Sequence, residues 1–129
     1  MPDAPAQSPI FVKTYDFLLW LIPVTLKFPR SQRFLLAERL SHLALDLYDT
    51  ILEAVLQPER QAEQLHRADR LLVKTRLYVR LSRDLECISL GQFEHAARRM
   101  DEIGRLIGGW QRKPARERRT ATGGVTATT

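Results

Sequence analysis

Residues 89–110 read SLGQFEHAARRMDEIGRLIGGW, and this stretch carries the most regular helical pattern of the chain. Ser89 followed three positions later by Gln92 is a capping box, in which each side chain bonds the backbone amide of the other residue. Apolar residues then recur every three or four positions, at Phe93, Ala96, Met100, Ile103, Ile107 and Trp110. The stretch therefore predicts an amphipathic helix that buries one stripe.

Three more segments with a helical period precede this one. Ser8-Pro9 predicts the start of a first helix, and the Phe28-Pro29 break with Ser31 as an expected cap predicts the start of a second. Pro58 closes the second segment, and a third runs from about residue 59 to about residue 85. We therefore expect an all-α fold, an antiparallel up-and-down four-helix bundle over residues 9–112, with disordered ends at 1–8 and 113–129.

Two of the predicted helices carry apolar residues on more than one side. The first helix has an expected core stripe from Phe11 through Tyr15 to Leu26, and other large apolar residues lie on its opposite side. In the third helix, too, apolar residues fall outside the expected core stripe. A single small bundle would leave such residues wet, which is typical of an interface. The predicted oligomer interface comprises Phe17, Trp20, Val24, Val73, Leu77 and Leu81.

The net charge of +5 is unevenly distributed. Residues 112–129 hold +4, residues 34–59 sum to −4, and residues 67–83 sum to +5. This last segment sets six cations against Asp69, and fixed guanidinium groups on a helix favour the phosphates of a duplex or a folded RNA. The candidate nucleic-acid and polymerase contacts are Arg67, Arg70, Lys74, Arg76, Arg80 and Arg83. Two alternatives stay open: a solvated helix face, or a contact with the acidic second helix of a neighbouring subunit.

The sequence offers little for catalysis or for metal binding. Glu63-x-x-His66 occurs once and points away from the expected core stripe, whereas a di-iron bundle uses two such pairs. There is no Gly-rich phosphate loop and no Cys or His cluster. We therefore expect a protein that is not an enzyme, with no cofactor and no metal.

The expected location is the cytoplasm. Cys87 is the single cysteine, so no internal disulfide can form, and the chain begins without a hydrophobic leader. The longest uninterrupted apolar run, residues 17–22, is short for a membrane span. We expect no contact with a membrane.

Four sequence features, taken together, resemble one known family. They are Tyr15, Phe28-Pro29-Arg30, Leu72-x-x-x-Arg76-x-x-x-Arg80-Leu81 and Ile103-Gly104-Arg105-x-x-Gly108-x-Trp110. Their order and spacing resemble the accessory variability determinant (Avd) proteins of diversity-generating retroelements, over about residues 11–112. The family also includes small four-helix proteins encoded in intervening sequences of ribosomal RNA genes.

The resemblance implies a barrel-shaped homopentamer with a positively charged surface. Such a protein would bind the retroelement reverse transcriptase and its structured template RNA, or an RNA/DNA hybrid, and support mutagenic cDNA synthesis. Arg76 and Arg80 match the arginines of the family's third helix, while the other four cations are assigned by their position beside them. The alternative is an orphan protein of the ribosomal intervening-sequence type, a structural oligomer without a role on nucleic acid.

Overall fold

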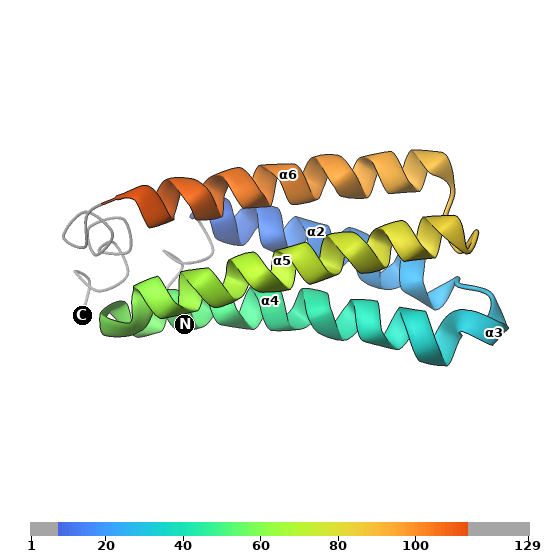
Figure 1. Ribbon diagram of the computed structural model, residues 1–129, viewed down its shortest axis with the longest axis horizontal. Coiled ribbons are helices and arrows are strands. Elements are labelled where there is room, and N and C mark those ends of the chain that lie inside the picture. Colours follow the sequence, from blue (N-terminus) through green and yellow to red (C-terminus); the bar gives the residue numbers. More distant parts are fainter. Residues whose placement is uncertain (1–7, 114–129) are drawn as a thin grey trace.

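Four long helices make up the computed structural model, which describes residues 8–113 (Figure 1). They are α2 (Pro9–Leu26), α4 (Glu38–Leu56), α5 (Gln61–Asp84) and α6 (Leu90–Arg112). The helices alternate in direction, so that the α2–α4 and α5–α6 connections lie at one end of the bundle and the α4–α5 connection at the other (Figure 1). Residues 8–113 contain no strand. The prediction of an all-α, up-and-down four-helix bundle is confirmed.

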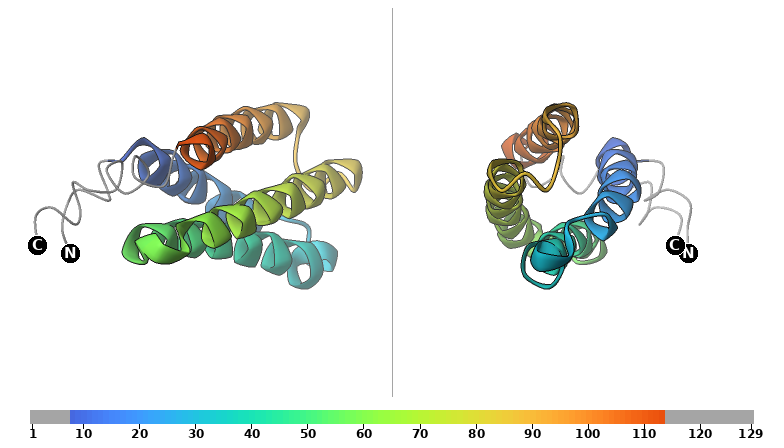
Figure 2. Two further views of the ribbon diagram at one scale, coloured as in Figure 1. Left: turned by 60° about the vertical axis from the view of Figure 1, so that its left-hand side comes forward. Right: turned by 90° about the vertical axis from the view of Figure 1, so that its right-hand side faces the viewer.

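The helices enclose one core. α2 packs against α4 and α6, and α5 packs against the same two helices from the other side; Figure 2 shows this arrangement from the end of the bundle. Large side chains that are fully buried come from all four helices and from the first connection. They include Phe17, Phe28, Leu40, Leu47, Ile51, Leu65, Ile103 and Ile107.

Helix α6 follows its sequence pattern closely. The Gln92 amide donates to Ser89 Oγ at 3.1 Å and the Ser89 amide donates to Gln92 Oε1 at 2.9 Å, so the predicted capping box is formed. Five residues of the predicted stripe are buried and Phe93 packs against the core at its edge. Local signals were therefore enough to place this helix and its inner face.

Short irregular elements form two of the connections. Between α2 and α4 lie the short helix α3 (Arg30–Gln32) and a π-helical turn, η1 (Arg33–Ala37). Ser31 lies inside α3 and does not cap it; the residue before the helix is Pro29. Between α4 and α5 lies a 3-10 turn, η2 (Pro58–Arg60).

Helix α2 faces the core differently from the prediction. Phe17 is 0% exposed and belongs to the core, so its assignment to an oligomer interface is wrong. Trp20 and Val24 are half-buried and pack against the core. Tyr15 and Leu26, expected to be inside, are exposed instead. The exposed large apolar residues of this helix are Val12, Tyr15, Leu19 and Leu26.

The reason for this difference lies in the composition of α2. Apolar residues surround the helix, so a periodicity argument cannot choose its inner side. Two buried threonines mark that side: Thr14 Oγ1 donates to the Ile10 carbonyl at 2.6 Å, and Thr25 Oγ1 donates to the Ile22 carbonyl at 2.7 Å. These bonds within the helix satisfy the hydroxyls, which lets threonine act as a core residue.

By length and composition α2 is also a candidate membrane span. Its 18 residues have a mean hydropathy of 1.3, and 39% of them are buried inside the bundle. The core helix of a soluble protein meets the same criteria, and the buried residues of α2 are part of the common core.

Candidate nucleic-acid interface

Helix α5 carries the candidate cations. Its core residues Leu65, Ala68, Leu72, Thr75 and Val79 are buried, as the sequence predicts. Four of the cations, Arg67, Arg70, Lys74 and Arg80, are exposed, whereas Arg76 and Arg83 are half-buried beside α6 and the α5–α6 connection.

Three of the cations lie in one exposed row. Arg67, Arg70 and Lys74 are exposed, and none of them forms an ion pair with a residue of 8–113. The first and the last of them are seven residue steps apart, which corresponds to about 10 Å along the helix axis. A row of cations fixed on a rigid helix without local acidic partners is the arrangement that suits phosphate contacts.

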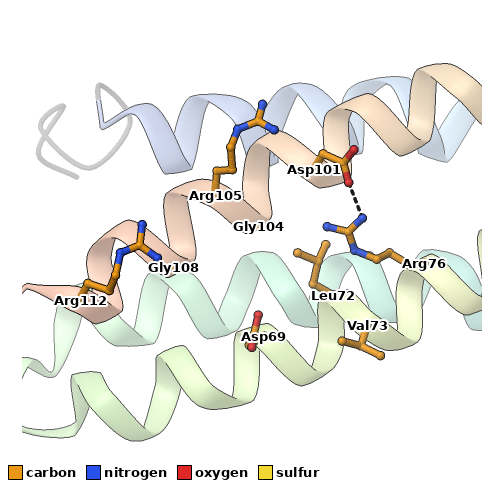
Figure 3. A pocket seen from close by; sticks show the side chains of 9 residues that line it. All are labelled: Asp69, Leu72, Val73, Arg76, Asp101, Gly104, Arg105, Gly108 and Arg112. Atoms are coloured by element: carbon orange, nitrogen blue, oxygen red, sulfur yellow. Dashed lines mark hydrogen bonds and ion pairs between the residues drawn. The ribbon is translucent and has the colours of Figure 1, made fainter.

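Arg76 is engaged inside the bundle. Its Nη1 lies 2.6 Å from Asp101 Oδ1 and its Nη2 donates to the Met100 carbonyl at 3.2 Å, so that it joins α5 to α6 (Figure 3). Gly104 makes room for this guanidinium, since a Cβ atom there would lie 3.0 Å from Arg76 Nη2 and 3.3 Å from Leu72 Cδ2. Arg76 therefore holds two helices together.

Arg80 and Arg83 form longer polar contacts than Arg76 does. Arg80 is well exposed, with Nε 4.0 Å from Asp84 Oδ2, a separation at which a surface ion pair contributes little. Arg83 Nη1 lies 3.5 Å from the Ile88 carbonyl, against the α5–α6 connection. The structure thus brings Arg76 and Arg83 against their own chain and leaves Arg80 exposed, on a different side of α5 from the row.

A groove between α5 and α6 adds cations that sequence reasoning missed. It has a volume of about 520 Å³, and Arg105 and Arg112 line it together with Arg76, over a floor that includes Gly104 and Gly108 (Figure 3). Arg98, Arg105 and Arg112 recur every seven residues, which is a signal in the sequence that could have found them. Asp69 and Asp101 also line this groove, so its charge is mixed.

Two side chains cross between α4 and α5 near the cation row. The Arg39 guanidinium of α4 lies 5.9 Å from the centre of the Tyr78 ring of α5, a cation–π geometry. Tyr78 is the one Phe, Tyr or Trp residue of α5, and so the residue of this helix that could stack on a base. Because Arg39 occupies its ring face, contacts of this surface with a nucleic acid would be mainly to phosphate.

The surface of α4 has the opposite charge. Glu38, Asp46, Asp49 and Glu53 are exposed and form no ion pair with the described part of the chain. An acidic helix face and a basic helix face therefore lie on adjacent elements of one molecule.

The Glu63-x-x-His66 pair is not assembled into a metal site. Glu63 Oε1 accepts from Arg60 Nη2 at 3.1 Å, and this hydrogen bond lowers the pKa of Glu63 and raises that of Arg60. Among the described residues, no group of three or more His, Cys, Asp or Glu side chains is placed to hold a metal ion.

Cys87 and His95 have shifted pKa values for a different reason, which is burial. Burial raises the pKa of the Cys87 thiol, so it stays protonated at neutral pH. Burial, and then the charges of Arg99 and Arg98, lower the pKa of His95, whose ring centre lies 4.5 Å from that of Trp20.

Comparison with known proteins gives one match. The family model described as bAvd-like matches residues 10–114, which is most of the chain. No curated protein and no solved structure matches. The matched region spans all four helices, including the α5 cations and the α6 glycines. The chain therefore belongs to the bAvd-like family, an assignment that points to an accessory protein of diversity-generating retroelements.

Proposed function

We propose that this protein is a non-catalytic accessory subunit of a diversity-generating retroelement, which binds the reverse transcriptase and the template RNA and supports mutagenic cDNA synthesis. The observation that carries the proposal is the exposed row of Arg67, Arg70 and Lys74 on α5, in a chain of the bAvd-like family. The proposed partners are the reverse transcriptase and the template RNA.

The row suits recognition of shape more than of base sequence. Guanidinium and ammonium groups on a rigid helix release counterions from phosphates, whereas reading bases would need aromatic faces or paired donors and acceptors. A structured RNA or an RNA/DNA hybrid presents phosphates at regular intervals to such a surface. We therefore expect affinity that depends steeply on salt and weakly on sequence.

The contacts of Arg76 revise its proposed role. Its guanidinium bonds Asp101 and the Met100 carbonyl, so we propose that Arg76 positions α5 against α6 and that Arg67, Arg70 and Lys74 make the RNA contacts. Arg80 is exposed on a different side of α5, and we propose it as a peripheral contact. Arg83 is expected to matter mainly for the α5–α6 connection.

The test is fluorescence anisotropy with labelled template RNA between 50 and 200 mM salt. The triple variant Arg67→Ala, Arg70→Ala and Lys74→Ala is expected to lose ten-fold or more in affinity, and its salt dependence should fall by about two to three in log–log slope. The matched control is the triple alanine variant at Lys27, Arg30 and Arg33, which removes the same charge from exposed positions between α2 and α4. An equal loss in both variants would show that net charge alone is responsible and would refute the α5 site.

We also propose that the protein is a homo-oligomer, a pentamer as the family resemblance implies. Val73, Leu77 and Leu81 are exposed on α5, and α2 exposes Val12, Tyr15 and Leu19 in place of the predicted Phe17. A contact between two different faces generates a ring when the rotation closes. Light scattering after size exclusion tests this: Leu77→Glu should reduce the mass to that of smaller species, and an unchanged mass would remove α5 from the interface.

One observation favours a second candidate, a structural oligomer with no role on nucleic acid. The four exposed acids of α4 named above are equal in number to the exposed cations of α5, which are Arg67, Arg70, Lys74 and Arg80. The α4 surface of one subunit could therefore neutralise the α5 surface of the next. Salt separates the two functions. If 0.5 M salt dissociates the oligomer while template RNA fails to bind at 50 mM, the structural role is supported; RNA binding that weakens with salt while the oligomer persists supports the accessory role.

A further inference from the structure

The corner between α2 and α4 exposes the most accessible large apolar side chains in residues 8–113. Phe34 is 83% exposed and Leu35 is 71% exposed, both on the π-helical turn η1, and Leu26 at the end of α2 is 66% exposed. We refer to Leu26, Phe34 and Leu35 as the apolar corner. Single exposed apolar residues are ordinary on protein surfaces, but three at one corner indicate a contact surface.

The backbone that carries the apolar corner is well anchored. Phe28 is buried just before the turn, and Leu36 and Ala37 are buried at its end. Ser41 Oγ donates to the Ala37 carbonyl at 2.8 Å and lies 3.1 Å from Thr25 Oγ1, which ties the turn to α2. The turn therefore holds Phe34 and Leu35 outward on a fixed support. π-Helical turns inside helices occur frequently at functional sites.

Two hollows flank Phe34. One, of about 220 Å³, lies between Phe34 and Leu26, beside Arg33 and Ser41. The other, of about 440 Å³, is lined by Phe34 and Leu35 with residues of the first turns of α4, among them His42 and Leu43. An aromatic side chain between two hollows can insert into a partner while side chains of the partner fill the hollows, which is the geometry of a protein–protein anchor.

The charge around the corner selects the partner. Lys27, Arg30 and Arg33 are exposed beside the apolar corner, and none forms an ion pair with a residue of 8–113. Glu38 lines both hollows, and Asp46 and Arg39 line the larger one, so the rim is basic on balance, with four cations against two acids. An apolar centre with a basic rim complements a protein surface with an apolar centre and an acidic rim.

Two other occupants fit less well. RNA could stack a base on Phe34, but Leu26 and Leu35 offer no flat face for stacking, so two thirds of the corner would stay unused. A second copy in a ring packs through the sides of the bundle, whereas α3 and the adjoining turn lie at its end (Figure 1).

We propose that the apolar corner is the docking site for a protein partner with an acidic, apolar surface, which under the proposed function is the reverse transcriptase. This inference rests on the proposed function and adds to it a division of labour. The corner contacts the polymerase and the α5 row contacts RNA, so the two partners bind different surfaces of one bundle.

The experiment is co-purification with the reverse transcriptase of a candidate diversity-generating retroelement, after nuclease treatment so that RNA cannot bridge the two proteins. The variant Phe34→Ala with Leu35→Ala removes side chains that contribute little to the core and should reduce capture about ten-fold or more. The matched control is Leu56→Ala, an exposed leucine at the end of α4. A second variant, Arg30→Glu with Arg33→Glu, should also lose capture, since it reverses the rim charge.

Each outcome bears on a different part of the proposal. Loss of capture with template RNA affinity and oligomer mass unchanged supports docking at the corner. Capture by wild type that persists in both variants overturns the corner while leaving the accessory function intact. Loss of RNA affinity, or of oligomer mass, in the Phe34 and Leu35 variant with capture retained assigns the corner to another occupant and overturns the inference. No capture by wild type overturns the polymerase-binding function, and the corner proposal with it.

Discussion

Alanine in place of Gly104 should behave differently from alanine in place of Gly109, although both glycines lie in α6. A Cβ atom at Gly109 would meet only Arg112 Nη2, at 4.0 Å, whereas one at Gly104 would lie 3.0 Å from Arg76 Nη2 and 3.3 Å from Leu72 Cδ2. The space beside Gly109 is open, whereas the space beside Gly104 is occupied by the Arg76 side chain, which joins α5 to α6.

The expected magnitudes follow from these contacts. Alanine is favoured over glycine by about 1 kcal/mol in a helix interior and by less near a helix end, so Gly109→Ala should stabilise by about 0.5–1 kcal/mol. At Gly104 the same gain is offset. The Arg76 guanidinium must move, and this movement weakens two contacts. One is its hydrogen bond to the Met100 carbonyl, which contributes about 1 kcal/mol to stability. The other is a partly exposed ion pair with Asp101, which contributes about 0.2–1 kcal/mol. Gly104→Ala should therefore change stability by between about 0 and −1 kcal/mol.

Thermal and urea unfolding measure this difference, and all variants are compared at one protein concentration because any self-association shifts the apparent Tm. For a domain of this size 1 kcal/mol corresponds to a shift in Tm of about 4–8 °C. Repeating Gly104→Ala in an Arg76→Ala background should recover part of the helix-propensity gain, with a coupling energy of about 0.5–1.5 kcal/mol. If Gly104→Ala stabilises as much as Gly109→Ala in both backgrounds, the assignment of Arg76 as a contact between helices is refuted.

Three further predictions concern stability. Ser89→Ala should lower the free energy of unfolding by about 1 kcal/mol in urea titrations, because α6 loses its capping box; a change below about 0.2 kcal/mol would contradict this. Ile103→Ala, at a site with 0% exposure, should cost about 2–5 kcal/mol, whereas Arg98→Ala on the exposed side of the same helix should stay within about 0.5 kcal/mol. Burial, followed by the charges of Arg99 and Arg98, lowers the pKa of His95 in the folded protein, so the unfolded chain takes up this proton at a higher pH. The stability that neutral His95 contributes is therefore complete above the usual imidazole pKa of about 6.5 and is lost as the pH falls below that value. Tm measured between pH 7.5 and 5.5 should therefore decline less in His95→Gln than in wild type, and an identical decline would exclude His95 as a cause.

The helical architecture was predictable because it depends on signals between residues close in sequence. The capping box at Ser89, the three-to-four spacing of the α6 stripe and the proline at Pro58 act within one or two turns of the chain. The same local period placed the inner face of α5 correctly. Charge segregation along the chain was equally visible, since counting charges requires no fold.

The candidate site was predictable only in outline. All six cations lie on α5 as expected, but no pattern in the sequence distinguishes an exposed arginine from one that bonds a neighbouring helix. The residues carried over from the family resemblance were Arg76 and Arg80, and the first of these is engaged by Asp101. Of the six, the exposed cations that form no ion pair in the described part of the chain are Arg67, Arg70 and Lys74, which the sequence marks only by their position near Arg76 and Arg80.

Tertiary packing decided the rest, because each of these features depends on distances between segments far apart in the chain. Helix α2 is apolar on every side, so contact with α4 and α6 selected Phe17 for the core and left Tyr15 outside. Gly104 leaves the space next to α6 that the Arg76 guanidinium occupies. Phe34 projects because packing on both sides of it anchors a π-helical turn, whereas periodicity alone predicts a regular helix there. Local physics sets where the helices run, and the fit between helices sets which side chains remain available for a partner.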